Sequence, residues 1–215
     1  MASSACEIRM SRLAHDPEGQ IYARRIWGIA GGTALFAGCV IAVALYIGSR
    51  QLLKDGFDWG YDVVLFAASA VVYGRGPQAE RACALLIGIV MATAGFHTLY
   101  DLWDKVVAPR PIEPMTLGFS ALSAATFGVI VVALLLRFRH SENPLIHATW
   151  VSSRNAMIST ALYSSVSLFA RLATSRYMEY ALDLFAAGLC FQAAIVIARD
   201  VLRDARKRRS RPVEA

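Results

Sequence analysis

The stretch Lys54–Gly74, KDGFDWGYDVVLFAASAVVYG, decides how the chain is organised. It begins with acidic residues and continues as a long apolar segment, in which Val63 to Val72 carry no charge. Asp58 and Asp62 are four residues apart, which places them on one face of a helix, with Asp55 on the same stripe. The stretch therefore predicts a transmembrane helix with two carboxylates in its outer half.

These two carboxylates are the first candidates for a binding site. An ionised group inside a bilayer costs at least ~2.5 kcal/mol, and such residues usually persist where they bind something. The alternative interpretation is that Asp58 and Asp62 lie at the membrane–water boundary and are merely solvated.

The composition is that of a membrane protein. Of the 215 residues, 56% are hydrophobic and 18% are charged, and the mean hydropathy is +0.45. A soluble domain has about 25% charged residues. The net charge of +6 then indicates membrane topology and not nucleic-acid binding. The four cysteines are scattered without a CxxC pair, so neither disulfides nor a structural zinc site is expected.

Six apolar segments are separated by polar, Gly-containing or Pro-containing links. Each is about 20 residues long, which matches the hydrocarbon thickness of a bilayer. The predicted helices are residues 27–48, 56–73, 82–103, 116–136, 148–170 and 178–198. The expected fold class is therefore all-α, a polytopic membrane protein. It has an N-terminal tail (1–25), a six-helix transmembrane domain (26–200) and a basic C-terminal tail (201–215).

The distribution of Lys and Arg predicts the orientation. The N-terminal tail, the 74–81 turn, the 137–147 link and the C-terminal segment from Arg199 hold fifteen of them, whereas the opposite links hold six. Cytoplasmic loops carry the excess of positive charge. Both termini are therefore expected in the cytoplasm, and the chain is expected to be a multi-pass protein of the cell (inner) membrane. The Asp58–Asp62 end of its helix then lies toward the outer face.

The order of these features, from about Arg24 to Arg203, resembles the cation diffusion facilitator family of metal-ion exporters. The residues that carry the resemblance are the Asp58–Asp62 pair in the second helix, Glu80 in the turn GRGPQAER, the element APRPIEP (108–114) after the third helix, and Asp183 in LDLFAAG at the start of the sixth. The resemblance implies six transmembrane helices that export a divalent cation, usually against protons, and that act as a homodimer.

The fifth segment departs from the family pattern. The family has a second pair of ligands there, but this chain has WVSSRNAMIST (150–160), with Ala156 where a carboxylate would stand and Thr160 where the second ligand would stand. Asp58 and Asp62 are therefore the firm metal ligands. Asn155 and Ser159, four residues apart, are expected to assist with neutral oxygens.

Two carboxylates with neutral oxygens make a hard, weak site. Such a site suits Mn²⁺, Mg²⁺ or loosely held Zn²⁺ or Co²⁺. The ion is cargo, so no resident cofactor is expected. The ligands titrate, which links metal release to proton uptake.

Several alternatives stay open. Ala156 favours a non-transporting family member that acts as a membrane partner or regulatory subunit. Arg154 could pair with Asp58 or Asp62 and compete with a cation. His97 and Asp101 form another pair four residues apart, which is either an exit or proton site or a solvated helix end. An enzyme is not expected, since the chain has no phosphate-binding loop and no Ser/His/Asp set at usable spacing.

Overall fold

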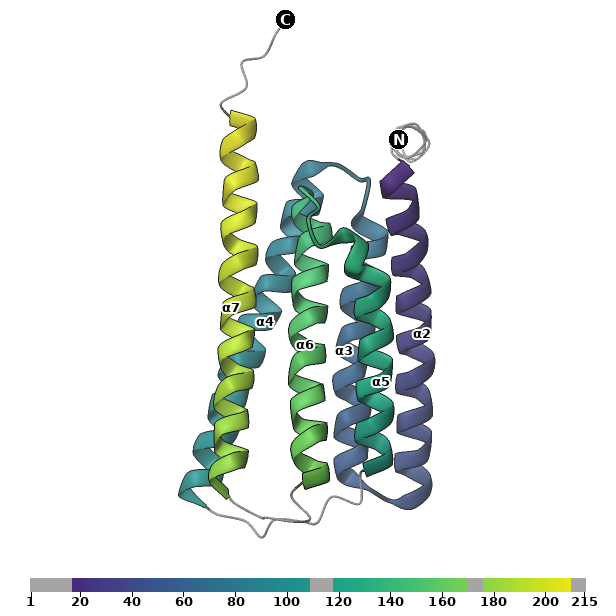
Figure 1. Cartoon of the computed structure of the whole chain (residues 1–215). Helices are drawn as coiled ribbons and strands as arrows, with labels where there is room; N and C mark the ends of the chain where they lie inside the picture. Colours follow the sequence, from purple (N-terminus) through teal and green to yellow (C-terminus); the bar gives the residue numbers. More distant parts are fainter. Residues whose placement is uncertain (1–16, 109–117, 170–175, 210–215) are drawn as a thin grey trace, which may run out of the picture. The chain divides into compact units, whose positions relative to one another are not determined.

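The computed structural model describes residues 17–108, 118–169 and 176–209, and every regular element in these ranges is a helix (Figure 1). The elements are α2 (Pro17–Ile47), α3 (Arg50–Val72), α4 (Pro77–Val107), α5 (Gly118–Leu135), the short 3₁₀ helix η1 (Leu136–Phe138), α6 (Pro144–Phe169) and α7 (Arg176–Arg209). The predicted all-α class is confirmed. An α-helix satisfies its backbone hydrogen bonds internally, as hydrocarbon requires.

The six predicted segments fall on these six α-helices, but several helices, including the first three and the last, are longer than predicted. α2 begins at Pro17, within the expected tail, and its residues Tyr22 and Ile26 are 0% exposed. α7 continues to Arg209 through the basic segment expected as a tail. Ala, Arg and Lys are strong helix formers, so a helix can outlast its apolar run. Residues 1–16, 109–117 (most of the APRPIEP link) and 210–215 lie outside the described ranges.

Glycine turns and polar caps separate the first three helices. Gly48 and Gly74 have positive φ angles of 69° and 78°, which a residue without Cβ adopts readily. The Ser49 hydroxyl accepts a hydrogen bond from the Leu52 N–H at 3.3 Å and so caps α3. The Glu80 carboxylate accepts from the Gly74 N–H at 2.8 Å, which fixes the turn before α4.

The chain divides into two units, Met1–Cys83 and Ala84–Ala215. In the first unit, α2 and α3 lie side by side and antiparallel (Figure 1). Two aromatic pairs join them, with ring centroids 5.0 Å apart in each case: Tyr22 with Tyr73, and Phe36 with Trp59. The two helices are therefore joined both near the middle of α3 and just beyond its C-terminus.

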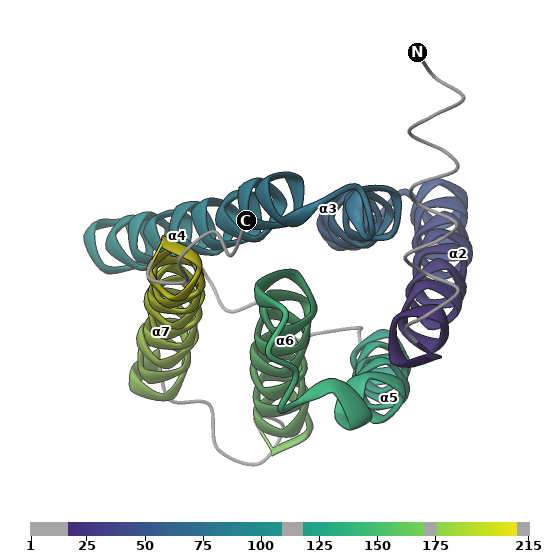
Figure 2. The same ribbon diagram turned by 90° about the horizontal axis from the view of Figure 1, so that it is seen from above.

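In the second unit, α7 lies between α4 and α6, and α6 lies between α7 and α5 (Figure 2). Glycines mark the close approaches. A Cβ built at Gly95 of α4 would lie 3.1 Å from the Phe191 ring of α7, and one at Gly128 of α5 would lie 3.5 Å from Met157 of α6. Small residues at such positions let membrane helices approach each other closely.

Three helices are long and apolar enough to cross a membrane: Gly19–Ile47, Pro77–Val107 and Tyr180–Lys207, with mean hydropathies of 2.1, 1.9 and 2.0. They indicate a membrane protein. Two further apolar helical segments, Trp59–Val72 and Ser123–Phe138, are shorter.

The α2–α3 contact predicts opposite effects for two neighbouring glycines. A Cβ at Gly56 would lie 2.5 Å from Ile41 Cγ1, whereas a Cβ at Gly60 meets nothing within 4 Å. We expect Gly56→Ala to destabilise the protein by about 1–3 kcal/mol, as overpacking does. Gly60→Ala should leave stability unchanged or raise it by up to about 1 kcal/mol, because Ala favours the helix. Thermal unfolding in detergent measures both, and equal midpoints for the two variants would contradict this packing.

Candidate functional site

The sequence-predicted metal ligands are distributed over both units. Asp58 and Asp62 lie on α3 in the first unit, and Asn155 and Ser159 lie on α6 in the second. The side chain of Asp58 lies outside the described part of the structure, as does that of Asp55. Each unit is therefore considered separately below.

Asp62 lies in the apolar part of α3. The helical segment Trp59–Val72 contains no other charged residue. Asp62 is half-buried, and it is engaged in at least one polar interaction. Trp59, three residues earlier, packs edge-on against Phe36 of α2 and fixes this turn of the helix. A carboxylate thus stands within an apolar segment, one turn after Asp58, as the sequence predicts.

Asn155 is held in a network of hydrogen bonds between α6 and α7. It is 1% exposed. Its amide nitrogen donates to the Leu189 carbonyl at 2.7 Å and to the Gln192 side-chain oxygen at 2.9 Å. Its own side-chain oxygen accepts from Arg154 Nε at 3.1 Å and from Arg154 Nη2 at 3.0 Å. The oxygen predicted to assist a metal ion therefore already holds a guanidinium.

Ser159 lies one turn further along α6 and is half-buried. Several of the other α6 hydroxyls are satisfied on their own helix. The Thr149 hydroxyl donates to the Leu145 carbonyl at 2.9 Å, and the Ser165 hydroxyl donates to the Ala161 carbonyl at 2.7 Å. Such back-bonding satisfies these hydroxyls without water. Among the described residues, the Ser153 hydroxyl oxygen is the one buried side-chain polar atom without a hydrogen-bond partner.

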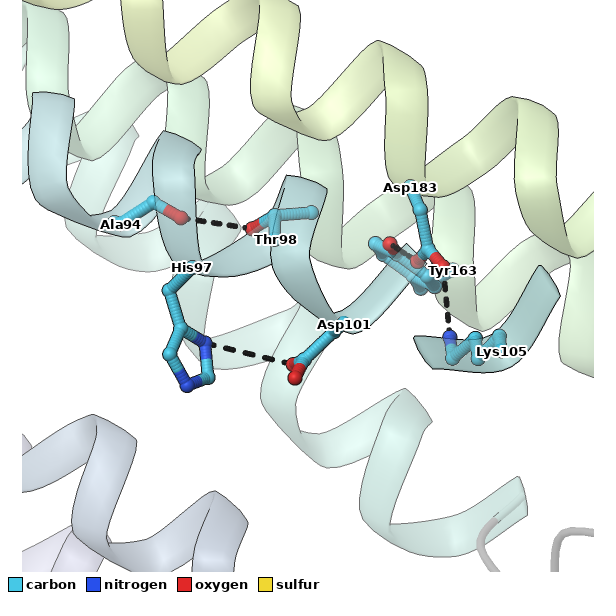
Figure 3. A network of polar contacts seen from close by, with 7 residues as sticks. All are labelled: Ala94, His97, Thr98, Asp101, Lys105, Tyr163 and Asp183. Carbon is cyan, nitrogen blue, oxygen red and sulfur yellow. Dashed lines mark hydrogen bonds and ion pairs between the residues drawn. The ribbon is translucent and has the colours of Figure 1, made fainter. Parts of the chain in front are cut away.

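Asp183 is a buried carboxylate that joins three helices (Figure 3). In the sequence, it is distinguished only by its position at the start of the sixth predicted helix. Its side chain is 5% exposed, and it accepts a hydrogen bond from Lys105 Nζ of α4 at 2.7 Å. The Tyr163 hydroxyl of α6 donates to its other oxygen. The Tyr180 hydroxyl of α7 donates to the Lys105 carbonyl at 3.2 Å. We call Lys105, Tyr163 and Asp183 the Asp183 network.

The His97–Asp101 pair forms on α4, as the sequence spacing predicts, but it is largely exposed. The His97 Nδ1 and Asp101 Oδ2 atoms are 3.4 Å apart, and the side chains are 63% and 39% exposed. Figure 3 shows this pair apart from the Asp183 network. An exposed pair of this kind contributes at most about 1 kcal/mol. The geometry agrees with a solvated helix surface.

A second polar contact joins α6 to α7 beside a cavity. His147 Nδ1 lies 2.6 Å from Asp200 Oδ2, with both side chains about three-quarters buried (25% and 26% exposed). The cavity has a volume of about 320 Å³, and its lining includes Arg139, Arg203 and Lys207 together with the carboxylates Glu142 and Asp204. Basic and acidic groups face it in near balance, so no single type of ion is favoured.

Among the described residues, no three His, Cys, Asp or Glu side chains are grouped so that they could hold a metal ion. This search does not include the Asp58 side chain. A comparison of the chain with protein-family models gave no match, and no curated protein matched it.

The Asp183 network makes a prediction about stability. Removing one partner of a buried ion pair leaves an uncompensated charge and costs about 3–5 kcal/mol. For Lys105→Met we expect about 3 kcal/mol by the same argument, because Lys105 is 37% exposed and Tyr163 still donates to Asp183. Thermal and denaturant unfolding in detergent measure the loss.

Two control variants separate the loss of the Lys105–Asp183 ion pair from the loss of side-chain packing. Asp101→Asn breaks an exposed pair on the same helix and should cost less than about 1 kcal/mol. The double variant Lys105→Met/Asp183→Leu removes both charges and should be more stable than Lys105→Met alone. If Lys105→Met were as stable as the native protein, the ion pair would not be holding these helices together.

Proposed function

We propose that the chain carries a divalent cation across a membrane, with Asp58 and Asp62 as its carboxylate ligands. The observation that carries this proposal is Asp62, a half-buried carboxylate in the apolar segment Trp59–Val72, one helical turn after Asp58. Ionisable residues within membrane helices are rare and commonly mark an ion path. The resemblance of the sequence pattern to the cation diffusion facilitators supports the same activity.

The proposed topology has six membrane-spanning helices and both termini in the cytoplasm of the cell (inner) membrane. Three helices with the length and hydropathy of membrane spans support it, together with the excess of Lys and Arg on one set of links. The two shorter apolar segments and α6 would be the remaining spans. A homodimer is proposed from the same resemblance.

The chemistry follows from the ligand types. Carboxylate and hydroxyl oxygens suit a hard ion such as Mn²⁺, and without thiolate or imidazole ligands Zn²⁺ or Co²⁺ would be held only loosely. Each carboxylate must lose its proton to bind the ion and can regain one on release, which couples transport to a pH gradient. Ser159 is proposed as an assisting oxygen donor. Asn155 is a poorer one, because its oxygen accepts two hydrogen bonds from Arg154.

A second candidate function is that of a membrane partner or regulatory subunit that transports nothing. The observation that favours it is the engagement of Asn155 with Arg154, Leu189 and Gln192, which gives this residue a structural role. Ala156, which supplies no ligand atom, points the same way.

Transport measurements on Asp62 test the first function. Purified protein in proteoliposomes should take up Mn²⁺, Zn²⁺ or Co²⁺ under a pH gradient. Asp62→Asn keeps the shape of the side chain and removes its charge. We expect uptake to fall by about 100-fold or more, because the loss of even an outer-shell partner costs about 10–100-fold. The matched control is Asp101→Asn, an exposed carboxylate on α4, which should reduce uptake only mildly.

The other outcomes are equally informative. Equal losses in Asp62→Asn and Asp101→Asn would remove the special role of α3. Absence of uptake for all three ions by well-folded native protein would favour the partner or regulatory function.

A further inference from the structure

Side-chain amide oxygens hold the guanidinium of Arg154, as they would hold a bound cation. Its guanidinium donates to the side-chain oxygen of Asn155 from both Nε and Nη2, at 3.1 and 3.0 Å. Nη2 also lies 3.4 Å from the side-chain oxygen of Gln192. One oxygen comes from α6 and the other from α7. Carbonyl oxygens of this kind are what a protein uses to bind cations without supplying a compensating charge.

The two amides are held in position before any cation is considered. Asn155 donates to both the Leu189 carbonyl and Gln192, and it is 1% exposed, so its oxygen has a fixed direction. Gln192 is an exposed residue of α7, and the hydrogen bond that it accepts from Asn155 orients its side-chain oxygen. A preorganised pair of acceptors binds a cation with little ordering cost.

The contacts between α6 and α7 hold this site rigidly. Three polar contacts follow one another along the two helices: His147 with Asp200, Asn155 with Gln192, and Tyr163 with Asp183. On α6 the three residues are eight apart, and on α7 they are eight and nine apart, in reverse order. This spacing follows the rows of every fourth residue by which antiparallel helices interlock. The amide pair is therefore fixed by a polar contact on either side.

The charge of Arg154 distinguishes this arrangement from an ordinary ion pair. The hydrogen-bond acceptors that the structure gives its guanidinium are neutral amide oxygens. A guanidinium is always protonated, so the site carries a full positive charge. A diffusible cation would meet both that charge and an oxygen whose lone pairs are already used.

We propose that the amide oxygens of Asn155 and Gln192 form a site for a planar organic monocation of the guanidinium type, which Arg154 fills as a tethered occupant. The site is separate from the carboxylates of α3 and does not depend on whether they carry a metal. Removal of Arg154 should open it to a free guanidinium compound. The tether also accounts for a charged residue in an α6 whose other polar residues are neutral from Ala148 to Phe169.

Chemical rescue tests this assignment. Arg154→Ala deletes atoms that ethylguanidinium reproduces, so millimolar ethylguanidinium chloride is the probe. We expect Arg154→Ala to lower the unfolding temperature in detergent and ethylguanidinium to restore about half of the loss or more, saturably, as a ligand of the folded state does. Native protein and Arg203→Ala, which lacks an exposed cation on α7, should show no such rise. Tetramethylammonium, which cannot donate hydrogen bonds, should be inactive.

A double variant tests the contribution of the Asn155 side-chain oxygen. Arg154→Ala/Asn155→Leu lacks the acceptor and should not be rescued. An unrescued Arg154→Ala, or equal rescue with and without Asn155, would overturn the proposal. Should Arg154→Ala fail to fold, Arg154→Val keeps part of the stem, leaves the position of Nε open and is titrated with millimolar methylguanidinium. Saturable stabilisation of that variant supports the site, and its absence overturns it.

Discussion

The carboxylate of Asp183 is the interaction on which the second unit depends. It is buried on α7, and it accepts hydrogen bonds from Lys105 of α4 and Tyr163 of α6. An ionised carboxylate in an apolar interior is tolerated only when it is paired and hydrogen-bonded. Asp183 therefore requires its partners, and because they come from two other helices, this requirement fixes how three helices meet. Close approaches at Gly88 and Gly95 of α4 become possible once these helices are held together.

The same physical requirement explains α6. This helix is rich in hydroxyls and amides, which are unfavourable to bury without hydrogen-bond partners. The hydroxyls of Thr149 and Ser165 avoid this cost by donating hydrogen bonds to carbonyls of their own helix. The amide of Asn155 avoids it by donating hydrogen bonds to Leu189 and Gln192 of α7. The polar residues of α6 thus have partners within the protein and stabilise helix packing. Their abundance alone therefore does not define an ion path.

The two proposed cation sites, at the carboxylates of α3 and at Asn155 and Gln192, use charge in opposite ways. In the proposed function, Asp62, which is half-buried among apolar residues of α3, exchanges a bound ion for a proton. Arg154 cannot lose its proton and is held by neutral oxygens. A titratable group suits transport, whereas a permanent charge suits a fixed occupant. The two sites would therefore differ in function although both concern cations.

The sequence predicts the helices well because apolar runs bounded by Gly, Pro and charged links leave little choice in a bilayer. It predicts the helix ends less well: Tyr22 lies in a polar stretch, and only its burial shows that α2 has already begun. For the site, it identifies Asp62 and the spacing of Asp58, which depend on one helix.

Contacts between helices are not contained in such local spacing. Nothing in WVSSRNAMIST indicates that Asn155 would bond to Gln192, because that contact depends on how α6 and α7 pack. Lys105 and Asp183 offered a signal of pairing that sequence reasoning did not use: they are charges of opposite sign near the ends of two apolar segments. Ionisable residues in such positions commonly pair with one another.

The most direct test of the central claim is equilibrium binding of Mn²⁺ to the purified protein, followed by electron paramagnetic resonance. The native protein is predicted to bind Mn²⁺ saturably and to release protons as it does so. The Asp58→Asn/Asp62→Asn variant, folded to the same helical content, should bind none. Undiminished binding by that variant would contradict the assignment of these carboxylates as the ligands.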